Sequence, residues 1–179
     1  MMRVAELYGG SLYDLAAEEK QERDLLEEMQ GVQHLLRENP QYVALLSEPS
    51  IPKEKRLELL DQAFRAELKP YLLNFLKLIT ERGLLFQYAG MCRAYEQRYN
   101  AAHNIAEALV RTAVPLEEGE RGKLKEALEK QSGKQVVLKE RIDASLLGGM
   151  VVEMDGKTLD GSVAGRLLAI RKKVEEIVL

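Results

Sequence analysis

The chain has 179 residues, enough for one large domain or two small ones, and its 46% hydrophobic and 31% charged residues are typical of a folded protein. Its formal net charge of -3 is evenly spread, with 13 basic and 16 acidic side chains in residues 1–104 and 13 of each in residues 105–179, so nucleic acid is excluded as an expected partner. No stretch approaches the roughly 18 consecutive apolar residues of a membrane-spanning helix, and we expect no direct membrane insertion.

The first predicted helix begins at Val4 and carries an apolar stripe within an arc of roughly 140°. The stripe, which includes one serine, consists of Val4, Leu7, Tyr8, Ser11, Leu12 and Leu15. Ala5, Gly9 and Ala16 flank it on one side, where a second helix could approach closely. Because glycine lowers helix propensity by about 1 kcal/mol relative to alanine, we predict that Gly9 and Gly10 serve packing.

Further helices are predicted up to residue 104, each bounded by proline, asparagine or glycine. They cover residues 25–36, 42–46, 57–64, 71–82 and 84–102. The helix from Tyr71 to Arg82 is unusual, because its apolar side chains cover roughly 220° of the helical wheel. A helix packed on one side needs an apolar arc of only about 100°, so this arc indicates burial on two sides or a face that awaits a partner.

The pattern changes after Asn104, where short β-rich segments alternate with helical ones. Residues 105–112 and 135–142 are predicted strands, residues 116–131 a helix, and Asp155-Gly156 the turn of a hairpin between residues 149–154 and 157–159. Ser162 can cap a final helix. The predicted fold is therefore α+β and multi-domain, with an all-α bundle of five or six helices in residues 1–104 and a small α/β domain in residues 105–179 that holds a hairpin-containing sheet and a C-terminal helix.

Two short motifs suggest chemistry that their context contradicts. Gly156-Lys157-Thr158 matches the end of a phosphate-binding loop, but the glycine required five residues before Gly156 is replaced by Val151. Gly161-Ser162-Val163-Ala164-Gly165 matches a nucleophile elbow in letters, yet the domain is too small for a hydrolase sheet and no oxyanion segment is present. We therefore predict a hairpin and a helix cap at these motifs.

No other residues form a site with catalytic or ligand-binding spacing. His34 and His103 are far apart and neither has a second ligand at helical spacing, so no metal site is predicted. Cys92 is the single cysteine, which excludes an intrachain disulfide and favours a small core thiol. The prediction is a chain with no catalytic residue, no metal and no cofactor.

Basic residues gather on the final predicted helix, namely Arg166, Arg171, Lys172 and Lys173. Complementarity to the helix dipole, together with solubility, is one explanation for them. Docking to an acidic partner helix is the alternative.

Three groups of residues carry a resemblance to a known family. They are Val4-Ala5 with Tyr8 and Leu12, then Asn74-Phe75-Leu76 to Glu81-Arg82-Gly83, and above all Leu147-Gly148-Gly149 through Asp160-Gly161-Ser162-Val163 with Gly165-Arg166-Leu167. In these residues, as in its length and helical-then-α/β order, the chain resembles the delta subunit of bacterial F-type ATP synthase, a relative of the mitochondrial oligomycin-sensitivity-conferring protein.

The resemblance implies a non-catalytic peripheral-stalk subunit of a proton-translocating ATP synthase, one copy per complex, peripheral at the cytoplasmic face of the bacterial cell membrane. The N-terminal bundle is expected to bind the N-terminal helix of an alpha subunit in a groove between its first and fifth helices. The C-terminal domain is expected to meet the b subunits, with Arg166, Arg171 and Lys172 as candidate contacts. The stalk would then hold the alpha/beta head against rotor torque during ATP synthesis.

The first helix and the helix from Tyr71 to Arg82 are the two that would line this groove. The expected contacts are Val4, Tyr8, Ser11, Leu12, Leu15, Phe75, Leu78 and Ile79. The same stripes must also build the core of the bundle, so each residue has a purely structural alternative. Gly9 and Gly10 stand where the family favours alanine, which predicts a shallower groove wall or a more mobile first helix.

One alternative reading stays open from the residues themselves, an adaptor or chaperone-like module of another complex. The helical half alone would permit it.

Overall fold

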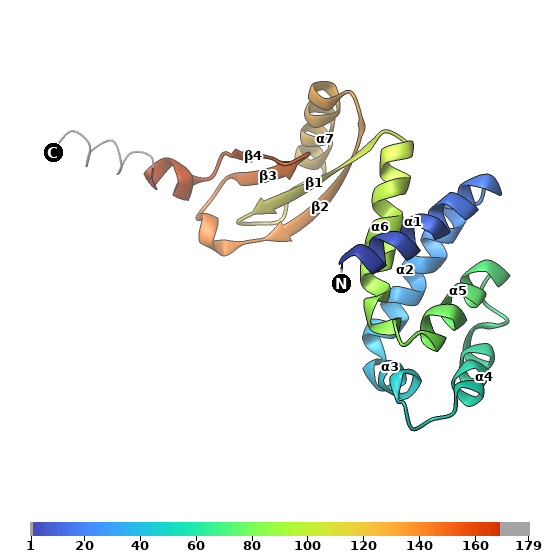
Figure 1. Cartoon of the computed structure of the whole chain (residues 1–179). Helices are drawn as coiled ribbons and strands as arrows, with labels where there is room; N and C mark the ends of the chain where they lie inside the picture. The colour runs from blue at the N-terminus through green and yellow to red at the C-terminus, as the bar shows by residue number, and fades with distance from the viewer. Residues whose placement is uncertain (1, 169–179) are drawn as a thin grey trace. The chain divides into compact units, whose positions relative to one another are not determined.

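The computed structural model describes residues 2–168, and the chain divides into two compact units, Met1–Tyr99 and Asn100–Leu179. Each unit has its own hydrophobic core, helical in the first and formed by a sheet and a helix in the second. This arrangement confirms the predicted α+β class (Figure 1).

The first unit is built from helices joined by short turns. They are α1 (Met2–Glu18), α2 (Glu22–Glu38), α3 (Pro40–Ser47), α4 (Lys53–Phe64), α5 (Pro70–Glu81), the short 3-10 helix η1 (Leu85–Gln87) and α6 (Tyr88–Ala102). Prolines stand at the first turn of α3 and α5, where the missing N–H costs no intrahelical hydrogen bond. Gly83, with a left-handed φ of 64°, follows α5, and the single helix predicted from Leu84 to Ala102 is divided into η1 and α6.

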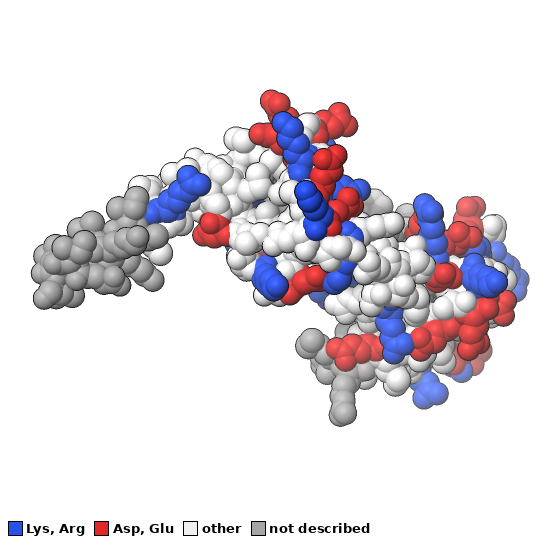
Figure 2. Space-filling model, turned by 90° about the horizontal axis from the view of Figure 1, so that it is seen from above, with Lys and Arg blue, Asp and Glu red and all other residues white. Residues whose placement is uncertain are grey.

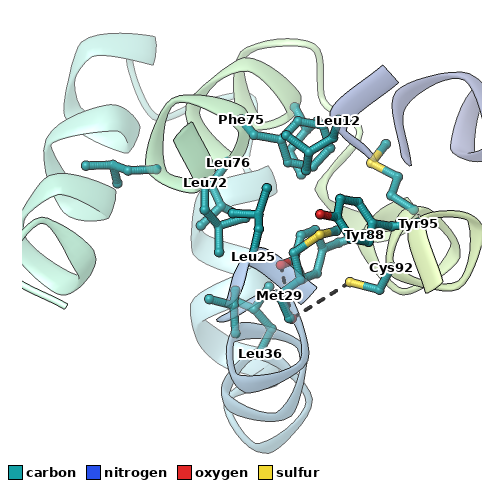
Figure 3. Close-up of a cluster of buried hydrophobic side chains, with 14 of the residues drawn as sticks. Leu12, Leu25, Met29, Leu36, Leu72, Phe75, Leu76, Tyr88, Cys92 and Tyr95 are labelled. Atoms are coloured by element: carbon teal, nitrogen blue, oxygen red, sulfur yellow. Dashed lines mark hydrogen bonds between the residues drawn. The ribbon is translucent and has the colours of Figure 1, made fainter. Parts of the chain in front are cut away.

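The core of this unit lies where α2, α5 and α6 meet (Figure 3). Met29, Leu72, Leu76 and Tyr95 are fully buried. The backbone carbonyl of Met29 accepts a hydrogen bond of 3.1 Å from the Tyr88 hydroxyl and a longer one of 3.8 Å from the Cys92 thiol. The buried polar atoms of these two side chains therefore have partners, as burial requires.

The small residues of α1 pack against α6. A Cβ at Gly9 would lie 2.3 Å from the carbonyl oxygen of Met91, and one at Gly90 would lie 3.1 Å from the Ala5 Cβ. The predicted close approach of a second helix is thus confirmed. Gly9 faces α6 and Gly10 faces the Arg98 side chain, so neither glycine lines the groove itself.

The second unit is a four-stranded mixed sheet in the order β2-β1-β3-β4. Its elements are β1 (Ile105–Thr112), α7 (Glu118–Ser132), β2 (Gln135–Ile142), η2 (Ala144–Leu146), β3 (Met150–Met154) and β4 (Lys157–Asp160). β1 and β2 are parallel and joined through α7, which covers one face with Leu128. α7 begins two residues later than predicted, because Glu117 and Glu120 form a capping box.

The hairpin and the final cap agree with the sequence prediction. Asp155 and Gly156 have φ values of 50° and 74°, as a tight turn between antiparallel β3 and β4 requires. The Ser162 hydroxyl accepts a hydrogen bond of 2.9 Å from the Gly165 N–H and donates one of 2.7 Å to Asp160. Residues 163–168 are helical.

The buried thiol gives a direct test of this core. Burial raises the pKa of Cys92 to about 12, so at pH 8 only about one thiol in ten thousand is ionised. We predict that an aromatic disulfide reagent at pH 8 labels the native chain orders of magnitude more slowly than the urea-unfolded chain, monitored by absorbance. Rapid stoichiometric labelling without denaturant would contradict the burial of this thiol.

Candidate functional site

A groove of about 390 Å³ lies on the surface of the first unit between α1 and α5. Its lining residues are Leu7, Tyr8, Ser11, Leu12, Leu15, Phe75 and Leu78. Two helices far apart in the sequence supply one wall each. The groove therefore exists only in the folded unit.

The wide apolar arc of α5 explains why this helix can serve the core and the groove together. Leu72, Leu76 and Ile79 are fully buried on one side. On the other side Tyr71 and Leu78 keep 40% and 42% of their surface exposed. Both consequences expected of such an arc, burial and an exposed apolar face, therefore occur on the same helix.

The floor and rims of the groove differ in exposure. Leu12 and Phe75 are 5% and 8% exposed and form the floor, where Figure 3 shows them side by side. Leu7 and Leu15 on α1 are 66% and 42% exposed and stand at the rim with Leu78. Large apolar side chains so exposed around a concave apolar floor are typical of a binding surface for another protein.

Tyr8 connects the two walls. Its ring lies 6.5 Å from the ring of Phe75, centre to centre, at a tilt of 59°. Among the described lining residues, Tyr8 is also the only one with an ionisable side chain. The groove thus offers apolar contact and two hydroxyl groups, a chemistry suited to the apolar face of a helix.

Six of the eight predicted contact residues line the groove, all except Val4 and Ile79. Val4 is half-buried on α1 outside the lining set. Ile79 is fully buried in the core, so its position gives an incoming helix no access to it. Leu7 lines the groove although it was not among the predicted contacts; its place in the α1 stripe was the available signal.

The other sequence motifs lie in structural positions. Lys157 and Thr158 belong to β4, next to the hairpin turn, and Ser162 is 2% exposed with its hydroxyl engaged in the cap. His34 lies 3.1 Å from Glu38 on the same helix. Within residues 2–168 no three metal-ligating side chains gather in one place, and no helix has the length and apolarity needed to cross a membrane.

The second unit exposes both basic and apolar side chains on its last described turn. Arg166 is exposed, while Arg171 and Lys172 lie outside the described residues. Val163, Leu167 and Leu168 beside it are 43%, 54% and 59% exposed.

On the face shown in Figure 2, Lys and Arg alternate with Asp and Glu, so no large field of one sign develops there.

Comparison with known proteins gives matches along nearly the whole chain. The family model described as "ATP synthase delta (OSCP) subunit" matches residues 4–174. The chain is 31% identical over 173 residues to ATP synthase subunit delta of Shouchella clausii, covering 96% of this chain and 95% of that one. It is 27% identical over 176 residues to ATP synthase subunit delta of Alkaliphilus oremlandii, covering 98% of each.

A solved structure shares the fold. A chain of the Toxoplasma gondii mitochondrial ATP synthase hexamer superposes with a TM-score of 0.73, covering 95% of this chain and 96% of that one, at 20% sequence identity.

Neighbouring residues on α5 test the assignment of groove and core. Truncating the half-exposed Leu78 to alanine should change the free energy of unfolding by less than about 1 kcal/mol, whereas Ile79→Ala should cost about 2–5 kcal/mol because it leaves a cavity. Urea denaturation of the full-length variants measures both. Equal losses for the two variants would show that the two faces of α5 are wrongly assigned.

Proposed function

The chain belongs to the ATP synthase delta (OSCP) subunit family, and we propose that it is a non-catalytic peripheral-stalk subunit of a proton-translocating F-type ATP synthase. In this role it links the alpha/beta catalytic head to the b subunits, so that rotor torque drives ATP synthesis. One copy acts per complex, peripheral at the cytoplasmic face of the bacterial cell membrane. The family match over residues 4–174 supports membership of the complex.

The α1–α5 groove is the single observation that carries the linking role. We propose that it binds the amphipathic N-terminal helix of an alpha subunit. Leu7 and Leu15 are eight residues apart on α1, a span of about 12 Å at 1.5 Å per residue. An incoming helix therefore matches the groove with about two turns, whose apolar side chains recur at i, i+4 and i+7.

The groove supplies apolar anchors for a holding contact. A dissociation constant in the low nanomolar range corresponds to roughly -12 kcal/mol. Complete burial of one leucine contributes about 1.5–3 kcal/mol, and Leu7, Leu15 and Leu78 each keep at least 42% of their surface for a partner. In many interfaces a few such anchors dominate the affinity. Here they stand over the preformed floor of Leu12 and Phe75.

For the second unit we propose contact with the b subunits through the last described turn. Val163, Leu167 and Leu168 are exposed beside Arg166. The apolar side chains would supply affinity, and Arg166 at the rim would supply attraction to an acidic partner. This surface is separate from the groove, so each partner can be tested alone.

Groove binding is tested by titrating the full-length chain with a peptide of the alpha-subunit N-terminal segment from the same organism. Leu15→Glu and Leu78→Glu should each raise the dissociation constant about 100-fold, because the bound peptide would force a carboxylate out of water. Calorimetry or fluorescence anisotropy measures the change.

Leu45→Glu in α3 is the matched control, since Leu45 is 41% exposed and lies outside the groove. It should leave the affinity within about twofold, as a substitution at a site remote from the interface. If all three variants bind the peptide like the parent chain, the groove is not the binding site.

The b-subunit contact is tested with a soluble fragment from the C-terminal end of b. Leu167→Glu and Leu168→Glu should each weaken binding at least about tenfold, whereas Arg166→Ala should have a smaller effect that shrinks further at high salt. Peptide binding by the groove serves as the folding control. Loss of b binding in Arg166→Ala alone would contradict an apolar contact.

A further inference from the structure

One face of α1 lines the groove, and another packs against α6. At about 100° per residue, Gly9 lies about 160° around the helix from Ser11 and about 120° from Leu15. Tyr8 and Leu12 lie about 100° and 60° from Gly9, so the groove residues of α1 and its contact with α6 occupy neighbouring, different faces of the helix. Any change in the spacing of α1 and α6 must move the groove wall.

The α1–α6 contact leaves no room for a side chain at Gly9. A Cβ there would lie 2.3 Å from the Met91 carbonyl oxygen and 2.9 Å from the Ala94 Cβ, both below the 3.0 Å that real Cβ atoms keep. The closest of these atoms belongs to the backbone of α6, and Met91 itself is fully buried. Neither the Met91 carbonyl oxygen nor the Ala94 Cβ can move away by a rotamer change, as the end of a flexible side chain could.

A second glycine interlocks with the first. Gly90 on α6 faces Ala5 on α1, and its added Cβ would approach the Ala5 Cβ to 3.1 Å. Each helix thus contributes a glycine and an alanine, four residues apart, to the same contact: Ala5 and Gly9 on α1, Gly90 and Ala94 on α6.

We propose that Gly9 is a positioning residue for partner binding, because it sets the spacing of α1 and α6 and thereby the separation of α1 from α5 across the groove. The proposal rests on the proposed function of the groove. α5 is fixed independently by Leu72 and Leu76, which are fully buried in the core. A displacement of α1 from α6 therefore moves Ser11 and Leu15 relative to Phe75 and Leu78, and binding sites tolerate only about 0.5 Å of such misplacement.

The test compares Gly9→Ala with Gly10→Ala in the full-length chain. Both substitutions bring the same gain in helix propensity. They differ in surroundings, because a Cβ at Gly10 would meet only the end of the Arg98 side chain, at 3.3 Å. Gly9→Ala should weaken binding of the alpha N-terminal peptide about tenfold or more, with Gly10→Ala within about twofold of the parent.

Two further measurements separate positioning from plain destabilisation. Val43→Ala in α3 is a mild core truncation away from α1, and it should retain the parent affinity once the folded fraction is taken into account. In the absence of peptide, the methyl NMR shifts of Leu15 and Leu78 should change in Gly9→Ala and stay in place in Gly10→Ala. If Gly9→Ala does not fold, Gly90→Ala replaces it, with the same expected direction at its milder 3.1 Å contact.

Parent-like peptide affinity and unchanged methyl shifts in Gly9→Ala would overturn the proposal. If the parent chain itself does not bind the peptide, the proposed function fails, and the methyl shifts still decide whether Gly9 positions the groove wall.

Discussion

The structure of the first unit depends on α5 having an apolar surface too wide for one interface. Leu72, Leu76 and Ile79 close the core, and Tyr71 and Leu78 remain outside it. Because apolar area left in water is unfavourable, such a face persists in a folded protein mainly where a partner covers it. The groove is the consequence of this division, with Phe75 at its floor between the two faces.

α1 forms the other wall of the groove, and its two faces also make different contacts. Its residues Ala5 and Gly9 pack against α6, and its leucines, with Tyr8 and Ser11, line the groove toward α5. In the second unit, α7 covers one face of the sheet. The other face carries ion pairs such as Lys139–Glu107 at 2.9 Å and Arg111–Glu153 at 3.2 Å. The apolar side chains Val163, Leu167 and Leu168 on its last described turn are exposed.

Local signals in the sequence located most elements. The strands at 105–112 and 135–142 and the Asp155-Gly156 turn agree with the structure, because β-branched runs and a positive φ depend on neighbours in the sequence. The burial of individual side chains could not be predicted in this way. Helical spacing places Leu78 and Ile79 on the same broad arc, and only the packing of α5 on the rest of the unit decides that one is half-exposed and the other buried. The two helices that form the groove could therefore be predicted from the sequence. The individual residues that line it required the tertiary structure.

In the proposed function, another helix binds at the surface between α1 and α5. The most direct measurement is amide NMR mapping of the isotope-labelled full-length chain during titration with the alpha N-terminal peptide. We predict shifts concentrated at Leu7, Ser11, Leu15 and Leu78. Shifts centred instead on the exposed apolar side chains elsewhere in the unit, Leu35, Leu45 and Phe86, with the groove unperturbed, would contradict it.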